Sequence, residues 1–272
     1  MVENMAVSGS AQPKIDTTVS HSARIWNYWL GGKDNYPVDR EMGDKILAYV
    51  PELVRSARAD RYFLARAVRF LVQEQGIRQF LDIGTGLPTV DNTHKVAQRI
   101  APECRIVYVD NDPLVLVHAR ALLTSTTEGA CDYIDADLRE PGKILEQAAK
   151  TLDFTQPVAI TMLGILNFIV DTDEARAILH QLLGGVPSGS YIAISHPTTE
   201  VDAEPAAVAL EFWNSSGAAP MCLRPRDELR LFFEGTELVE PGVVSCSRWR
   251  PDLAEVGAVV DVMHFCGVAR KP

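Results

Sequence analysis

The chain of 272 residues lacks several features that would place it in a specialised class of protein. It has five cysteines, and none of them belongs to a Cys-x-x-Cys pair, so the sequence indicates neither a zinc site nor a redox pair. Its longest apolar stretch, residues 158–170, contains polar residues and is shorter than the roughly 20 residues that span a membrane. We therefore expect no transmembrane helix and no metal.

An excess of basic residues is also absent. The chain has 26 lysine and arginine residues against 36 aspartate and glutamate residues, which gives a net charge of −10. This balance opposes broad binding to nucleic acid, which depends on neutralising many phosphates. The N-terminus has no basic segment followed by a long apolar one, so we expect no secretory signal. We predict a cytoplasmic protein with free thiols, no nucleic-acid partner and a disordered tail at residues 1–14.

From residue 77 onward, short β-rich runs alternate with longer helical patterns. The spacing of the first four runs leaves room for a crossover helix between parallel strands. Several runs are apolar at consecutive positions, as expected for strands that are covered on both faces. The candidate strands are residues 79–83, 105–109, 132–134, 158–162 and 191–194, followed by 237–244 and 262–268. This pattern predicts an α/β fold with a doubly wound, mostly parallel seven-stranded sheet and a C-terminal antiparallel hairpin.

Helical patterns precede the predicted sheet. Residues 51–75 carry apolar side chains at helical spacing, and Gly76 stands where this helix would end. We predict an N-terminal helical cap at residues 15–76 and the sheet domain at 77–272. The polar side of the helix carries Arg55, Arg58, Arg61, Arg66 and Arg69. A solvated face is the usual role of such residues, and contact with a carboxylate or phosphate is the alternative.

The first predicted strand ends in a turn with the pattern D-x-G-x-G. Ligands bind at this point in open α/β sheets, and Gly84 and Gly86, with Thr85 between them, allow close approach of backbone N–H groups. A dinucleotide site has a further glycine or alanine where this chain has Thr89. The carboxylate of Asp82 would repel a pyrophosphate but suits a ligand with an ammonium or sulfonium group.

Acidic residues also follow the next two predicted strands. Asp110, followed by Asn111, lies 24 residues after Gly86, and its carboxylate can accept hydrogen bonds from both hydroxyls of a ribose. Asp137 and Leu138 follow the third strand. Aspartates at three successive strand ends indicate a nucleoside ligand more specifically than any one motif does.

These motifs resemble those of class I S-adenosylmethionine-dependent methyltransferases. The segments 26–36, 189–196 and 232–242 are similar to an uncharacterised bacterial group of these enzymes, once known only as a domain of unknown function. The similarity extends over roughly residues 15–270. It implies a Rossmann-like fold, S-adenosylmethionine as the cofactor and methyltransferase activity.

The resemblance also implies roles for the motif residues. The methionine part of the cofactor would be held by Asp82, Gly84, Thr85 and Gly86, the ribose by Asp110 and Asn111, and the adenine by Asp137 and Leu138. Leu163, at the end of the fourth strand, would lie beside the reactive methyl group.

A loop with two glycines, residues 31–36, is predicted to form a lid. Its Lys33 is a candidate partner for the cofactor carboxylate, and Asn35 is a second polar candidate. The aromatic residues Trp26, Tyr28, Trp29 and Tyr36 either line an acceptor pocket or pack inside the cap. His196, just past the fifth strand, is the best-placed histidine for a general base.

The leading hypothesis is therefore an S-adenosylmethionine-dependent methyltransferase that acts on an O or N atom of a small molecule. A regulatory module that binds the cofactor without turnover is the first alternative. An NAD-dependent oxidoreductase is the second, weakened by Asp82 and Thr89. Assembly as a homo-oligomer stays open.

Overall fold

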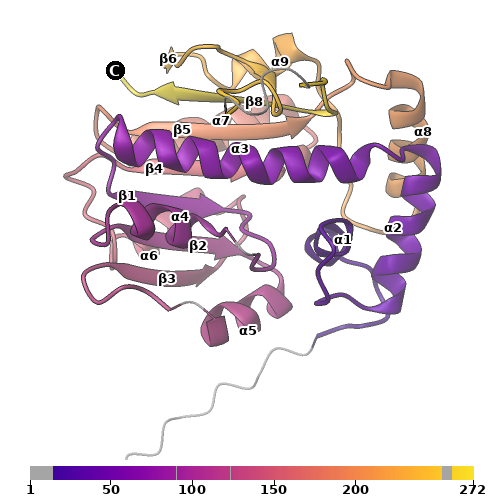
Figure 1. The fold of residues 1–272 in the computed structure, drawn as a ribbon, viewed down its shortest axis with the longest axis horizontal. Helices are drawn as coiled ribbons and strands as arrows, with labels where there is room; N and C mark the ends of the chain where they lie inside the picture. Colours follow the sequence, from indigo (N-terminus) through magenta and orange to yellow (C-terminus); the bar gives the residue numbers. More distant parts are fainter. Residues whose placement is uncertain (1–14, 90, 123, 253–258) are drawn as a thin grey trace, which may run out of the picture.

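The computed structural model describes residues 15–89, 91–122, 124–252 and 259–272. The predicted tail, residues 1–14, lies outside the described residues. At the centre is one sheet with the strand order β3-β2-β1-β4-β5-β8-β6, in which β7 also pairs with β8 (Figure 1). Its strands are β1 Gln79–Ile83, β2 Arg105–Asp110, β3 Ala130–Asp135, β4 Ala159–Leu163, β5 Tyr191–Pro197, β6 Glu237–Leu238, β7 Val244–Ser245 and β8 His264–Arg270.

The sheet is doubly wound, as predicted. Strands β1 to β5 are parallel to one another, and the chain moves outward from β1 to β3 before it crosses back to β4 beside β1. Strand β8 is antiparallel to β5, and β6 and β7 are antiparallel to β8. The described residues form eight strands instead of seven, because Pro241 and Gly242 interrupt the predicted strand at residues 237–244 and divide it into β6 and β7.

Helices cover both faces of the sheet. They are α1 Ser22–Trp29, α2 Pro37–Tyr49, α3 Leu53–Gln73, α4 Thr93–Ile100, α5 Pro113–Leu122, α6 Pro141–Ala148, α7 Thr172–Gly184, α8 Ala203–Ser215 and α9 Arg226–Leu231, with a short 3₁₀ helix η1 at Leu166–Phe168. In β1, Phe80 packs with residues of α3 and α4, whereas Leu81 and Ile83 pack with residues of α6 and α7. This alternation places Asp82 on the side of α3 and α4.

Three helices meet beyond the carboxyl ends of the strands. Helices α1, α2 and α8 share a separate apolar cluster that includes Trp29, Ile46 and Trp213 (Figure 1). Helix α3, which the sequence assigned to the cap, packs on the sheet. The division at residue 76 remains a prediction, and we use the word cap below for α1, α2 and α8.

Buried polar contacts hold α1 in place. The fully buried Asp39 accepts hydrogen bonds from the backbone N–H groups of His21, at 3.0 Å, and Tyr36, at 2.8 Å. The imidazole of His21 lies 3.0 Å from the carboxylate of Asp112, just after β2. The start of α1 is therefore attached to the carboxyl edge of the sheet. None of the helices described here is long and apolar enough to cross a membrane.

Candidate functional site

A pocket lies between the carboxyl ends of β1, β2 and β4 and the cap. Its polar half is lined by the turn after β1 and by the end of β2, and its apolar half by α1, α2, α8 and the start of β8. Seven of the eleven residues that the sequence assigned to the cofactor line this pocket. They are Asp82, Gly84, Thr85, Gly86, Asp110, Asn111 and Leu163.

The turn after β1 requires glycine. Gly84 and Gly86 have φ angles of +75° and +64°, in the left-handed region that other residues adopt at a cost. A Cβ on Gly84 would lie 2.6 Å from the side chain of Ile165, whereas a Cβ on Gly86 would meet nothing within 4 Å. The turn therefore lies directly against the loop after β4 and leaves open space at Gly86.

Asp110 ties the ends of β1 and β2 together. One carboxylate oxygen accepts from the N–H of Gly86 at 2.7 Å, and the other accepts from the N–H of Asp112 at 3.0 Å. Burial raises the pKa of Asp110, and these two hydrogen bonds oppose the shift. Each carboxylate oxygen keeps further capacity to accept a hydrogen bond.

Asp82 is more enclosed than its strand-end position suggests. It is 7% exposed and accepts a hydrogen bond at 2.6 Å from the hydroxyl of Thr93. Burial raises its pKa, while Thr93 and the charge of Arg61 favour the ionised form. Its expected contact with a cationic group of the ligand stays a prediction.

Four predicted residues do not line the pocket. Asp137 accepts hydrogen bonds from Asn111 Nδ2 at 3.3 Å and from a backbone N–H at 2.8 Å, and Leu138 is buried in the core. Their assignment to the adenine stays a prediction. Asn35 donates to Asn27 Oδ1 at 3.0 Å, so it supports a pocket residue without lining the pocket itself.

Lys33 is exposed and lies away from the pocket. The reason is that Asn27 Oδ1 also accepts the N–H of Asp34, at 3.1 Å, which folds the loop back onto α1 with Lys33 outside. The pocket instead receives Arg61 from α3. Its guanidinium donates to the Thr89 hydroxyl and, at 3.1 Å, to the carbonyl of Asp91.

The interpretation of His196 as a general base is wrong. His196 is fully buried and does not line the pocket. Its Nδ1 lies 2.7 Å from the carbonyl of Pro197, and its Nε2 lies 2.8 Å from the guanidinium of Arg224. Because Arg224 can only donate, Nε2 is the acceptor. Burial lowers the pKa of His196 to about 3, so the ring is neutral and both nitrogens are occupied.

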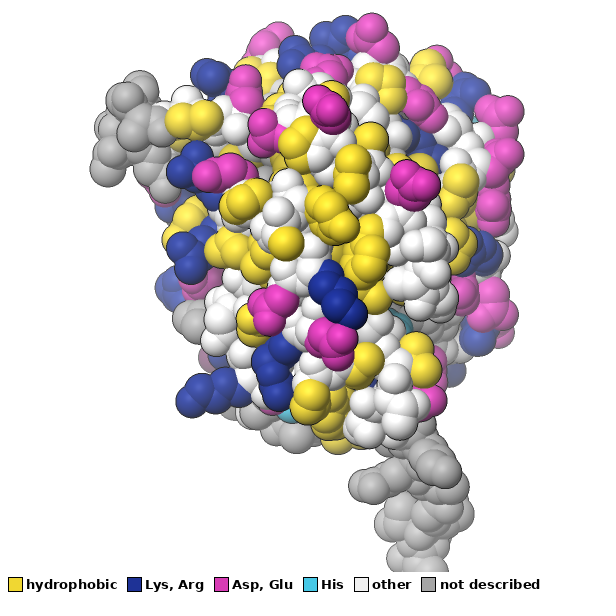
Figure 2. Space-filling model, turned by 90° about the vertical axis from the view of Figure 1, so that its right-hand side faces the viewer, with side chains coloured by type: hydrophobic (Ala, Val, Ile, Leu, Met, Phe, Trp, Pro, Cys, Tyr) yellow, Lys and Arg dark blue, Asp and Glu magenta, His cyan; other side chains and the backbone are white. Residues whose placement is uncertain are grey.

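The cap aromatics divide between the pocket and the surface of the cap. Trp26 and Trp29 line the pocket and also belong to the apolar cluster of the cap. Tyr28 instead donates to Asp44 at 2.6 Å, and Tyr36 lies beneath the guanidinium of Arg24. Figure 2 shows the outer side of the cap, where charged side chains are interspersed with hydrophobic ones. Trp26 and Trp29 face the pocket, on the inner side of the cap.

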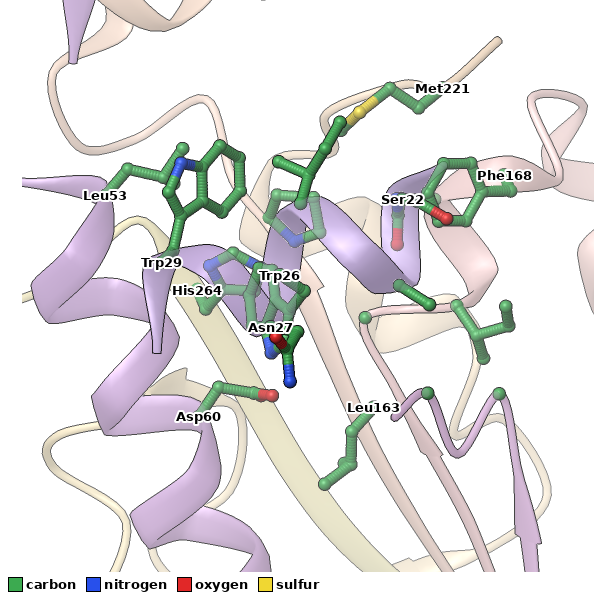
Figure 3. Close-up of a pocket in the computed structure, with 18 of the residues that line it drawn as sticks. Ser22, Trp26, Asn27, Trp29, Leu53, Asp60, Leu163, Phe168, Met221 and His264 are labelled. Carbon is green, nitrogen blue, oxygen red and sulfur yellow. The ribbon is translucent and has the colours of Figure 1, made fainter. Parts of the chain in front are cut away.

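Sequence reasoning missed several pocket residues. Asp60 on α3 and His264 at the start of β8 are 3% and 4% exposed, and both line the pocket (Figure 3). Burial raises the pKa of Asp60 to about 6 and lowers that of His264 to about 4. A signal for Asp60 was present, because it lies at helical spacing between the apolar Ala57 and Leu64.

Helix α8 also lines the pocket, which the sequence did not indicate. It contributes Ala206, Ala209 and Trp213 to the apolar half of the pocket. No group of three or more potential metal ligands is present in the part of the chain that the structure describes.

Comparison with known proteins assigns the family. The model of the S-adenosyl methyltransferase family matches residues 8–272. A crystal structure of a DUF574 family protein from Streptomyces avermitilis is 46% identical, covers 95% of this chain and 100% of its own, and has a TM-score of 0.92. A crystal structure of a proposed methyltransferase from Thermobifida fusca is 35% identical in sequence, covers 95% of this chain and 97% of its own, and has a TM-score of 0.85. No curated protein matches the chain.

The fold and the strand-end pocket define a Rossmann-like nucleoside-binding protein. The chain belongs to the S-adenosyl methyltransferase family. It is an S-adenosylmethionine-dependent methyltransferase, as the sequence predicted. Membership of this family argues against the NAD-dependent alternative.

Replacing Gly84 by alanine should destabilise the fold more than the same change at Gly86. Both substitutions carry the cost of a left-handed backbone, about 1–2 kcal/mol, and only Gly84→Ala adds overlap with Ile165, which costs about 1–3 kcal/mol more. Urea unfolding of the two variants and the wild type measures the difference. Equal destabilisation would show that the loop after β4 moves aside for the added methyl group at no cost in stability.

Asp60 should make the stability of the protein depend on pH. Its pKa is about 6 in the folded state and near 4 in the unfolded chain, so its stabilising contribution is complete below about pH 4 and is lost as the pH rises through about 6. Between about pH 4 and pH 7, the free energy of unfolding of Asp60→Asn should therefore gain on the order of 3 kcal/mol relative to the wild type. Urea unfolding at both pH values tests this. A pH-independent difference would contradict the assignment.

Proposed function

We propose that the protein transfers the methyl group of S-adenosylmethionine to an O or N atom of a small, largely apolar acceptor that binds beneath the cap. The observation that carries this proposal is the continuity of the pocket. Its polar half, at Gly86 and Asp110, opens into an apolar half lined by Trp26 and Trp213. Both substrates of a methyl transfer can therefore meet inside one cavity.

The residues of the polar half fit the cofactor. The open space at Gly86 admits a ligand against the backbone, and the unused lone pairs of Asp110 suit the hydroxyls of a ribose. When bound, the cofactor supplies a methyl group already activated by a sulfonium. The protein then has to position the acceptor and exclude water, which the cap residues do.

We assign the carboxylate of the cofactor to Arg61, in place of Lys33. Among the lysine and arginine residues that the structure describes, Arg61 is the one that lines the pocket. A guanidinium forms strong, directional hydrogen bonds with a carboxylate. The neighbouring arginine Arg58 is exposed, in keeping with a solvated role.

The apolar half favours a small molecule over a macromolecule. Helices α1, α2 and α8 cover it, and the net charge of −10 opposes broad contact with nucleic acid. A cytoplasmic location stays a prediction from the sequence, and assembly as a homo-oligomer stays open.

Calorimetric titration with S-adenosylmethionine, S-adenosylhomocysteine and NADH tests the cofactor half first. We expect micromolar binding of the first two, about −8 kcal/mol, and none of NADH. A screen of small O- and N-nucleophiles, followed by mass spectrometry of the products, then tests the acceptor half. Binding of the cofactor without any methylated product would support the regulatory module.

Asp110→Ala should weaken binding of S-adenosylhomocysteine. The substitution removes the acceptor of the two ribose hydroxyls, with an expected loss of about 1.5–3 kcal/mol. Calorimetry measures it, and circular dichroism checks that the variant is folded, because Asp110 also holds the N–H of Gly86. An unchanged affinity in the folded variant would refute the assignment to the ribose.

Arg61→Gln should weaken the binding of S-adenosylhomocysteine by about 1.5–3 kcal/mol and leave the binding of methylthioadenosine unchanged. The second ligand has the same nucleoside but no amino-acid carboxylate, so it isolates the contact with Arg61. Calorimetry with both ligands is the measurement, and Arg58→Gln on the exposed side of the same helix is the matched control. Equal losses for both ligands would point to general damage to the pocket and refute the assignment.

A further inference from the structure

The apolar half of the pocket contains a small set of buried polar side chains. Asn27, Asp60, Asn167 and His264 line the pocket and are all at most 5% exposed. Asn167 Oδ1 and His264 Nδ1 have no hydrogen-bond partner among the described residues. Figure 3 shows Asp60 projecting from α3 into the space that Asn27 enters from α1. Buried polar atoms without partners are rare in proteins, so this arrangement points to a ligand that carries polar hydrogens.

Asp60 is the charged member of this set. Its Oδ1 lies 3.9 Å from the thiol of Cys246, which is a weak donor. The guanidinium of Arg61 donates its hydrogen bonds to other residues, but its charge favours the ionised form of Asp60, as does the side chain of Ser195 on β5. Burial outweighs these contributions and raises the pKa of Asp60, so the ionised carboxylate is costly for the fold. A substrate that donates a hydrogen bond to it would recover part of this cost.

We propose that Asp60 accepts the hydrogen bond of the reacting O–H or N–H group of the acceptor and takes its proton during transfer. This inference rests on the proposed function. In the balanced step, the acceptor O or N atom forms a bond to the methyl carbon, and the carbon–sulfur bond breaks with its electron pair going to sulfur. The proton that the acceptor loses goes to the carboxylate of Asp60 and afterwards to water.

Several charged or titratable groups lie around Asp60. The charge of Arg61 on α3 favours the ionised form of Asp60. Burial raises the pKa of Asp82 in the same pocket and of the thiols of Cys246, after β7, and Cys266, on β8. His264 titrates at about 4, because burial lowers its pKa. A change in acceptor binding between about pH 5.5 and pH 8 that is lost in Asp60→Asn therefore reports on the carboxyl of Asp60, whose pKa is about 6.

The first test uses three probes of matched shape, para-ethylphenol, para-ethylaniline and para-ethyltoluene, titrated by calorimetry into protein saturated with S-adenosylhomocysteine. At about pH 8 we expect the phenol, the aniline or both to bind about tenfold more tightly than the toluene, because each can donate to an ionised carboxylate. A preference for the phenol alone indicates an O acceptor, and for the aniline alone an N acceptor. Equal affinity of all three, or no binding of any, would overturn the proposal.

The second readout is the pH dependence of phenol binding. Below the pKa of Asp60 the carboxyl is protonated and accepts poorly, so the preference for para-ethylphenol over para-ethyltoluene should fall several-fold from about pH 8 to about pH 5.5. In Asp60→Asn this change should disappear, and in Asp60→Glu it should persist. A pH dependence that survives in Asp60→Asn would overturn the proposal. The wild-type titration tests it even where a variant does not fold.

Turnover tests the transfer of the proton. With the acceptor found in the screen, Asp60→Asn should lower kcat about 100-fold and leave the affinity for S-adenosylhomocysteine within about twofold of wild type. An unchanged kcat would overturn the role of Asp60 as proton acceptor. Failure of the wild type to bind S-adenosylhomocysteine would instead count against the proposed function, so the two failures are distinguishable.

Discussion

The burial of charged groups at one edge of a parallel sheet governs the architecture of this protein. Because β1, β2 and β4 end side by side, Asp82 and Asp110 come together at that edge, and the cap removes them from bulk water. Each has partners that favour its ionised form: the hydroxyl of Thr93 for Asp82, and two backbone N–H groups for Asp110. These contacts determine how the turn after β1 and the loop after β2 are folded.

A buried arginine stabilises the opposite wall of the pocket. Arg224 is 1% exposed and donates to the carbonyls of Leu166, at 3.2 Å, and Ile169, at 2.7 Å, the first residue of the short helix η1 and the residue just after it. It also occupies Nε2 of His196. Arg224 therefore fixes the loop that carries Phe168 and Asn167 into the pocket, from the side that faces away from the pocket. His196 contacts Arg224 and does not line the pocket, so its role is structural. The position of a histidine at a strand end therefore does not by itself indicate a general base, because an arginine can occupy its free nitrogen.

The parts of the molecule that depend on local pattern were predictable from the sequence. β1 matches its predicted range, because consecutive apolar residues and a following glycine turn define a buried strand without reference to the rest of the chain. The polar half of the pocket followed from the rule that parallel strands end at one edge. The apolar half did not, because it is assembled from α1, α8 and the start of β8, which are far apart in the sequence. The position of Lys33 outside the pocket was unpredictable for a related reason: the hydrogen bonds of Asn27 that fold its loop have no local sequence pattern.

Asp60 and Arg61 show how one helix can serve both halves of the pocket. Adjacent residues on an α-helix point about 100° apart, so α3 directs Arg61 toward the loop after β1 and Asp60 toward the space between Cys246 and Asn27 (Figure 3). In the proposed arrangement, Arg61 holds the carboxylate of the cofactor and Asp60 holds the reacting group of the acceptor. Any displacement of α3 then moves both contacts together and preserves the alignment of the acceptor with the methyl group. Because methyl transfer from an activated donor depends chiefly on alignment, a single rigid helix that packs on the sheet is a suitable place for both residues.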